Sequence, residues 1–348
     1  MSPNILTWIG PLDLAAAAFT LPLFSLVLAV LIVVGTFLVP RLRRRLGRRA
    51  ATDGTPLPTV AARYRPEHRA FGIGAIAVIV VYAVENVVRG YLLNLVDIVE
   101  WWQYATPVFA AVLCLAVGLA LIVVRGTPGP EQPVLPSIRR TWLSFGPRAG
   151  LIGGALALGA LLATTIAAGL ASSADERGRF IYLEIPVPNT RLEPLRPWFY
   201  GWDFGVPVLI CLAALILVTW ATLRRNALRP YLRPDTVTAE RSARAQVASG
   251  VVALATAATL LALGGAFRFI GRYGSMSQLT VGNDGAGTTY DMTWRYAEFA
   301  AMAGWLAPAL EITGFALLLF AAIRQLRRPA PERQHPRPQP SPQPESVR

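Results

Sequence analysis

Apolar residues recur along this chain in seven blocks of about twenty, and a polar segment follows each block. A helix needs roughly twenty apolar residues to cross the hydrocarbon core of a bilayer. The pattern predicts an all-α, polytopic integral membrane protein, a bundle of seven transmembrane helices. The expected spans lie near residues 19–39, 70–96, 104–124, 149–171, 204–223, 247–267 and 300–323. They form one domain over residues 1–328, and we expect the proline-rich remainder, 329–348, to be a disordered cytoplasmic tail.

Composition agrees with a membrane protein. Of the 348 residues, 54% are hydrophobic and 15% are charged. A soluble protein carries about 25% charged residues, because its surface must face water. The charged residues are therefore too few to cover a water-soluble globule of this length.

The distribution of arginine between alternate loops predicts the orientation. The segments 40–69, 125–148, 224–245 and 324–348 hold 25 of the 33 basic residues, all of them arginine, and the loops of the opposite side hold 7. Short arginine-rich loops stay in the cytoplasm. We therefore expect the N-terminus outside and the C-terminus in the cytoplasm. The net charge of +13 then indicates topology and attraction to anionic lipid headgroups, not a nucleic-acid partner.

The first apolar block is expected to remain in the protein as a membrane helix. A cleaved signal peptide has positive charge before its apolar region. Here the preceding residues carry only Asp13, and the arginine-rich run 41–45 follows the block. This order of charges anchors a helix with its N-terminus outside.

Two outer loops carry local structure of their own. Residues 179–186 are expected to form an extended segment, and residues 278–281 and 288–293 a hairpin around a glycine-rich turn. The aromatic residues of the outer loops are expected to form an interfacial belt rather than a ligand site. They are Trp101, Trp102, Trp198, Tyr200, Trp202, Trp294 and Tyr296.

The second span carries a candidate intramembrane polar site. Its polar residues are Tyr82, Glu85, Asn86, Arg89 and Asn94, of which the first four form the candidate site. Glu85 and Arg89 are four residues apart and are placed to pair on one helix face. Glu311 lies near the middle of the seventh span, where Arg89 could bridge both carboxylates. Charged groups inside a bilayer are costly and usually mark function. The group is either a proton- or substrate-linked site or a clamp between the two spans.

Small residues recur at every fourth position of the fourth span, in two rows. One row is Ala155, Gly159, Ala163, Ala167 and Ala171, and the other is Gly146, Gly150 and Gly154. Such rows let helix backbones approach closely. We expect packing against another span of the same chain, with dimerisation as the alternative.

The spans offer no recognisable set of catalytic, cofactor-binding or metal-ligating residues. The two histidines, His68 and His335, fall in polar segments, which excludes haem ligation by membrane-embedded histidine pairs. The chain has no lysine, which excludes a retinal Schiff base. Cys114 and Cys211 lie in apolar blocks and are expected to be packing residues. We therefore expect no cofactor and no bound metal.

The pattern as a whole favours a transport component of a cell membrane, which we expect to be a bacterial plasma membrane. It would act either as an ion-coupled carrier or as a permease subunit with a partner ATPase or membrane subunit. The alternative is a sensory or accessory subunit of a larger membrane complex. An intramembrane enzyme acting on lipid ranks last, because no nucleophile or metal set is visible.

Overall fold

The protein was analysed as a computed structural model. The structure describes residues 23–39, 58–88, 100–126, 129, 131–132, 141–187, 194–281, 288–291 and 294–326. Six helices in these ranges are long and apolar enough to cross a membrane. They are α4 (Pro58–Val87), α5 (Thr106–Val124), α6 (Arg148–Ala171), α7 (Trp202–Leu228), α8 (Val237–Gly274) and α9 (Ala297–Leu326).

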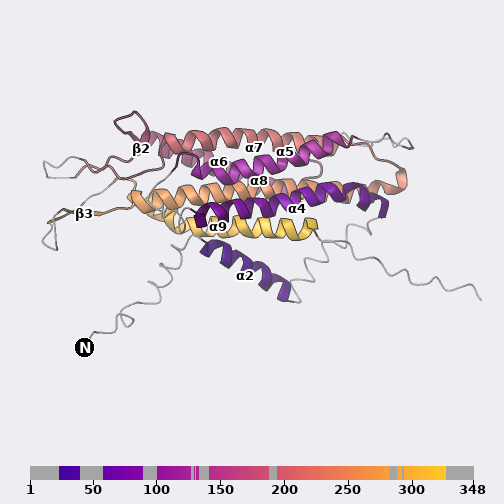
Figure 1. The fold of residues 1–348 in the computed structure, drawn as a ribbon, viewed down its shortest axis with the longest axis horizontal. Helices are drawn as coiled ribbons and strands as arrows, with labels where there is room; N and C mark the ends of the chain where they lie inside the picture. Colours follow the sequence, from indigo (N-terminus) through magenta and orange to yellow (C-terminus); the bar gives the residue numbers. More distant parts are fainter. Residues whose placement is uncertain are drawn as a thin grey trace, which may run out of the picture.

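The first expected span is represented by a shorter helix, α2 (Phe24–Leu38). Its 15 residues measure about 23 Å at 1.5 Å per residue, less than the roughly 30 Å of a hydrocarbon core. Residues 1–22 and 40–57 on either side lie outside the described part of the chain. Figure 1 shows α2 beside α9 and inclined to the rest of the bundle. Six candidate spans are therefore established, and a seventh stays a prediction.

Helices α4 and α8 extend further than the expected spans. Helix α4 begins at Pro58 rather than near residue 70, and α8 runs from Val237 to Gly274 rather than from 247 to 267. The added turns are polar but packed. Buried residues follow one another along α4 at steps of three and four, namely Val60, Tyr64, Glu67, Phe71, Ala75 and Val78. A polar segment that packs along a neighbour remains helical, so the span was predicted too short. The expected end of this span, residues 89–96, lies outside the described residues.

Helix α8 occupies the centre of the bundle. It packs against α4, α5, α6, α7 and α9, and most of its apolar stretch is buried. Its closest neighbour is α9, because glycines remove the side chains between them. A Cβ atom placed on Gly271 would lie 2.5 Å from the Cα atom of Gly304. The helices run side by side along the long axis of the molecule (Figure 1).

The two rows of small residues on α6 have different surroundings. Cβ atoms placed on Gly150 and Gly154 would meet Val252 and Thr256 of α8, so the prediction of internal packing is confirmed for these two residues, whereas Gly146 precedes α6 and a Cβ atom there would meet Leu151. The other row is mostly exposed, and nothing lies within 4 Å of a Cβ atom placed on Gly159. The prediction of internal packing is wrong for that row, because it lies on the face of α6 turned away from α8.

Four short strands lie at one end of the bundle. They are β1 (Ser173–Ala174), β2 (Phe180–Tyr182), β3 (Gln278–Val281) and β4 (Thr288–Asp291). Strand β1 pairs with β2, and β3 pairs with β4, both antiparallel. The expected extended segment and hairpin are therefore confirmed, while the turn at 282–287 lies outside the described residues. Both sheets lie at the same end of the bundle (Figure 1). One sheet connects α6 to α7 and the other connects α8 to α9, and consecutive helices run in opposite directions.

A second apolar core lies beneath these strands. Tyr200 is fully buried, and its ring packs edge-on against that of Tyr104 with centroids 5.3 Å apart. Tyr200 is therefore a core residue and not part of an interfacial belt, as its loop folds back over the helix ends. Trp101, Trp102 and Tyr296 are exposed at this end, which agrees with a belt.

Candidate functional site

An ion pair between a buried carboxylate and a partly exposed guanidinium joins α8 to α9 near the middle of α9, and the Arg268 side chain is 37% exposed. Arg268 donates from Nε to Glu311 Oε1 over 3.0 Å and from Nη2 to Glu311 Oε2 over 2.6 Å. Ser25 of α2 donates its hydroxyl to the same Oε2 over 2.6 Å. Glu311 is 1% exposed. Three helices therefore meet at one carboxylate, which accepts two hydrogen bonds from the guanidinium and one from the serine hydroxyl.

The local sequence makes room for this carboxylate. A Cβ atom placed on Gly264 of α8 would lie 2.7 Å from Glu311 Cγ, so the Glu311 side chain occupies the space that a larger residue would fill. Gly264 and Arg268 are one turn apart and lie on the same face of α8. Gly264 leaves space for the Glu311 side chain, and Arg268, one turn further along α8, supplies the positive charge that pairs with it.

Helix α4 brings the expected tyrosine to the same place. The Tyr82 ring packs edge-on against Phe315 of α9, with centroids 5.1 Å apart. Its phenol group lies close enough to Glu311, Arg268 and Glu85 to interact with them electrostatically. The structure thus gathers Tyr82, Glu85 and Glu311 around one site. We call Ser25, Tyr82, Glu85, Arg268 and Glu311 the mid-bundle cluster.

The remaining two expected site residues do not strengthen this cluster. Asn86 donates its side-chain amide to the backbone carbonyl of Tyr82 over 2.8 Å, a bond within its own helix. Arg89 lies outside the described residues, so its predicted bridge between the two carboxylates stays a prediction.

Arg268 was not among the expected site residues, because its position directly after the predicted sixth span placed it in an outer loop. The missed signal is the apolar sequence that continues past it, with Phe269 and Ile270, up to Gly274. Extending the predicted sixth span by two turns would have placed Arg268 inside the helix, where it could be recognised as a partner for Glu311.

A fully buried ion pair lies at the opposite end of the bundle from the strands. Arg229, just after α7, donates to both carboxylate oxygens of Glu67 on α4 over 2.7 and 2.9 Å. The side chains are 5% and 3% exposed. Burial lowers the pKa of Arg229, but the hydrogen bonds and the charge of Glu67 outweigh this effect, so the net pKa is raised. The pair ties the end of α7 to α4.

Arg244 of α8 completes this end of the bundle. It is fully buried and donates to Tyr64 Oη, to the carbonyls of Arg229 and Pro230, and to Glu240 Oε2. Its guanidinium also lies 4.3 Å from the ring centroid of Tyr231. Five N–H donors in a planar fork suit such a site. We call Glu67, Arg229, Glu240 and Arg244 the end network.

The end network is a structural clamp. Glu240 accepts from the backbone of Leu232 and from Thr236 as well as from Arg244, so its carboxylate is matched by local donors. The network fixes the short connection between α7 and α8, which includes the 3₁₀ turn η4 (Pro234–Thr236). None of its members was an expected site residue, since all were assigned to loops. The buried stripe of α4 that contains Glu67 was the available signal.

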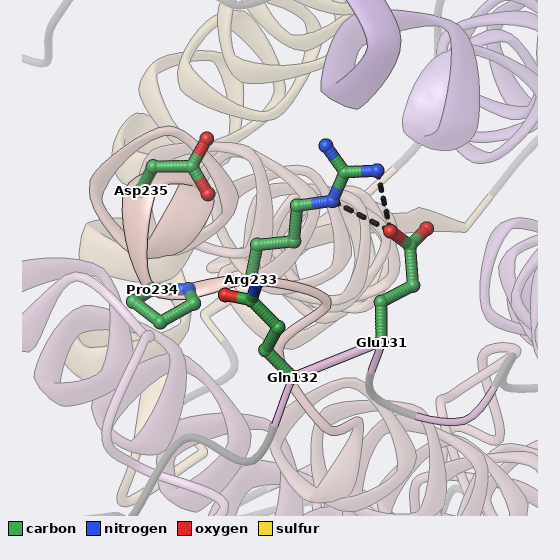
Figure 2. Close-up of a pocket in the computed structure, with 5 residues that line it drawn as sticks. All are labelled: Glu131, Gln132, Arg233, Pro234 and Asp235. Atoms are coloured by element: carbon green, nitrogen blue, oxygen red, sulfur yellow. Dashed lines mark hydrogen bonds and ion pairs between the residues drawn. The ribbon is translucent and has the colours of Figure 1, made fainter.

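A surface depression of about 550 Å³ lies beside the same connection, lined by Glu131, Gln132, Arg233, Pro234 and Asp235. Figure 2 shows Arg233 reaching Glu131, with Nε donating to Oε2 over 2.6 Å, while the Asp235 carboxylate points elsewhere. The paired side chains are each 53% exposed. Polar groups that do not converge and remain in contact with solvent make a poor ligand site.

His68 lies inside α4 rather than in a polar loop, with Nδ1 hydrogen-bonded to Gln325 of α9. Within the described residues, no group of three or more His, Cys, Asp and Glu side chains is arranged to hold a metal ion. The mid-bundle cluster is therefore the candidate site that the described residues support best.

Comparison with known proteins identifies no relative. No family model matches the chain, and no curated protein or solved structure is significantly similar to it. Conclusions about its function therefore depend on the residues themselves.

Proposed function

We propose that this protein is an ion-coupled carrier of a cell membrane, and that Glu311 is the site where the coupling proton binds. The supporting observation is the ion pair of Arg268 with the buried Glu311 carboxylate near the middle of α9, to which α2 adds a hydrogen bond from Ser25. We further propose that α2 completes a seventh span, with the N-terminus outside and the C-terminus in the cytoplasm.

Proton binding and the ion pair exclude one another. When Glu311 is protonated it loses the charge that attracts Arg268, and the bidentate contact between α8 and α9 weakens. The helix contact therefore depends on whether a proton is bound. A carrier needs this dependence, since its substrate-accessible states must differ in their affinity for the coupling ion.

A purely structural role explains the pair less well. Glu311 lies near the middle of α9, a depth at which charged groups are rare in a bilayer and mark ion pathways by default. The cluster is also formed by helices of this one chain, which favours a carrier over a permease subunit that depends on a partner ATPase.

The test is electrogenic or proton-coupled flux in proteoliposomes. Purified protein is exposed to an inward pH gradient and to a panel of amino acids, sugars, carboxylates and organic cations, with membrane current and luminal pH as readouts. At least one solute should drive proton entry, and Glu311→Gln should abolish that entry while preserving the shape of the side chain.

The matched control is Glu298→Gln, because Glu298 lies on the same helix but is exposed. It should retain the flux. Undiminished flux in Glu311→Gln would contradict proton binding at Glu311, and no flux with any solute would contradict the carrier proposal.

A further inference from the structure

One face of α7 forms a continuous apolar stripe that ends in a cation. Ile210, Leu217 and Trp220 are 66%, 63% and 41% exposed, and Val206 and Arg224 extend the series at steps of three and four. The opposite face, with Val208, Leu212 and Leu215, is buried in the bundle core. The stripe is therefore turned away from the protein along most of the helix.

The cation at the end of this stripe is held in place by an aromatic ring. The Arg224 guanidinium lies 5.1 Å from the ring centroid of Trp220, one turn earlier. This cation–π contact orients the guanidinium back over the apolar stripe. The adjacent Arg225 is also exposed and adds a second positive charge.

Depth places this arrangement at the edge of the hydrocarbon. Helix α7 runs from Trp202 to Leu228, so its midpoint falls near position 215, and Arg224 lies roughly 14 Å further along the axis at 1.5 Å per residue. Half of a hydrocarbon core is about 15 Å. With the helix midpoint at the bilayer centre, Arg224 lies at the edge of the hydrocarbon core, next to the headgroup region, and Trp220 lies one turn deeper.

We infer that this face of α7 is a binding site for one anionic phospholipid, whose acyl chain lies along Val206, Ile210 and Leu217 and whose phosphate contacts Arg224. A guanidinium donates two parallel N–H groups to phosphate oxygens. The neighbouring Arg225 disfavours cationic headgroups such as choline, so the site selects lipids with net negative charge. Bulky side chains at Ile210 and Leu217 suit an acyl chain better than a closely packed partner helix, which favours small residues.

The experiment measures lipid preference directly and does not depend on transport. Purified protein in mild detergent is titrated with equal amounts of phosphatidylglycerol and phosphatidylcholine, and bound lipids are counted by native mass spectrometry. Arg224→Gln should lower the preference for phosphatidylglycerol about five-fold, the contribution of one arginine near an anionic surface. Trp220→Leu keeps the stripe apolar and should lower it about two-fold, because the guanidinium loses its support.

Arg148→Gln is the control, because Arg148 is an exposed arginine in the first turn of α6 and lies at the same end of the bundle. It removes the same charge without touching the stripe, and it should leave the preference nearly unchanged. An unchanged preference in both α7 variants would overturn the site. An equal loss in Arg148→Gln would overturn it too, since general charge attraction would then explain the preference. Trp220→Leu retains the arginine and provides an independent test if Arg224→Gln does not fold.

Discussion

Buried and exposed ion pairs in this protein differ in their surroundings rather than in their chemistry. Glu67 and Arg229 are 3% and 5% exposed, whereas Glu131 and Arg233 are each 53% exposed. Breaking a buried pair leaves an uncompensated charge away from water. Breaking an exposed pair leaves both partners hydrated. The two pairs therefore allow the contribution of burial to be measured within one molecule.

Glu67→Gln should destabilise the protein by about 3–5 kcal/mol, because Arg229 would remain charged and buried without its counter-ion. Glu131→Gln makes the same chemical change and should cost less than about 1 kcal/mol. Unfolding in mixed detergent micelles, followed by circular dichroism, gives both values. Equal losses in the two variants would show that the end network does not act as a buried clamp.

The residues of the mid-bundle cluster differ in how readily each can be identified from the sequence alone. Glu311 could be found from sequence because it interrupts an apolar block. Its partner Arg268 could not be separated from loop residues by the same criterion, because it follows the block directly. Ser25 has no charge to distinguish it, and only the position of α2 beside α9 brings it to the carboxylate.

At the scale of helices, α8 and α9 approach most closely where two glycines face one another. A Cβ atom on Gly271 would lie 2.5 Å from Gly304 Cα and 2.8 Å from its backbone nitrogen. Backbone atoms cannot move aside as flexible side chains do. Close contact at this point holds the helix that carries Arg268 against the helix that carries Glu311.

Gly271→Ala should therefore destabilise the protein by about 1–3 kcal/mol, the usual cost of overpacking, and should weaken any flux that depends on Glu311. Gly159→Ala is the comparison, since nothing lies within 4 Å of a Cβ atom there. That change should be neutral or slightly stabilising, because alanine favours helix more than glycine does. Thermal unfolding of both variants measures the two changes in stability. If Gly271→Ala left the stability unchanged, α8 and α9 would be able to move apart at this contact without cost.

Helix bounds show a related limit of sequence patterns. Hydropathy locates the apolar middle of a span, but α4 and α8 continue as helices through polar turns that pack on neighbours. Glu67, Glu240 and Arg244 lie in those turns and are buried. A hydropathy average excludes these residues because they are polar. The spacing of three and four residues between buried positions on α4, in contrast, includes Glu67.

For the whole molecule, the strands and the end network lie at opposite ends of the bundle, and the distribution of arginine predicts which end faces the cytoplasm. In a background without Cys114 and Cys211, Glu176→Cys near β2 should react with a membrane-impermeant maleimide on intact cells. Thr238→Cys, exposed at the start of α8, should react only after lysis. The reverse pattern would contradict the proposed orientation.

An N-terminal epitope tag extends the same experiment to α2. If α2 completes a seventh span, the tag should be accessible on intact cells together with the cysteine at position 176. If α2 does not cross the membrane, the tag should be protected until lysis, since six spans place both termini on one side.

The sequence by itself determined that the chain is helical, where most of its helices long and apolar enough to cross a membrane lie, and that Glu311 is an exceptional residue within one of them. These features follow from the local cost of placing polar groups in hydrocarbon, which depends on residue type and spacing alone. Only the tertiary structure decided that Arg268 is the partner of Glu311, that Tyr200 belongs to the core, and that Glu67 and Arg244 are buried. These facts depend on which helix lies beside which, and pairings between helices distant in sequence leave no periodic signal in the chain.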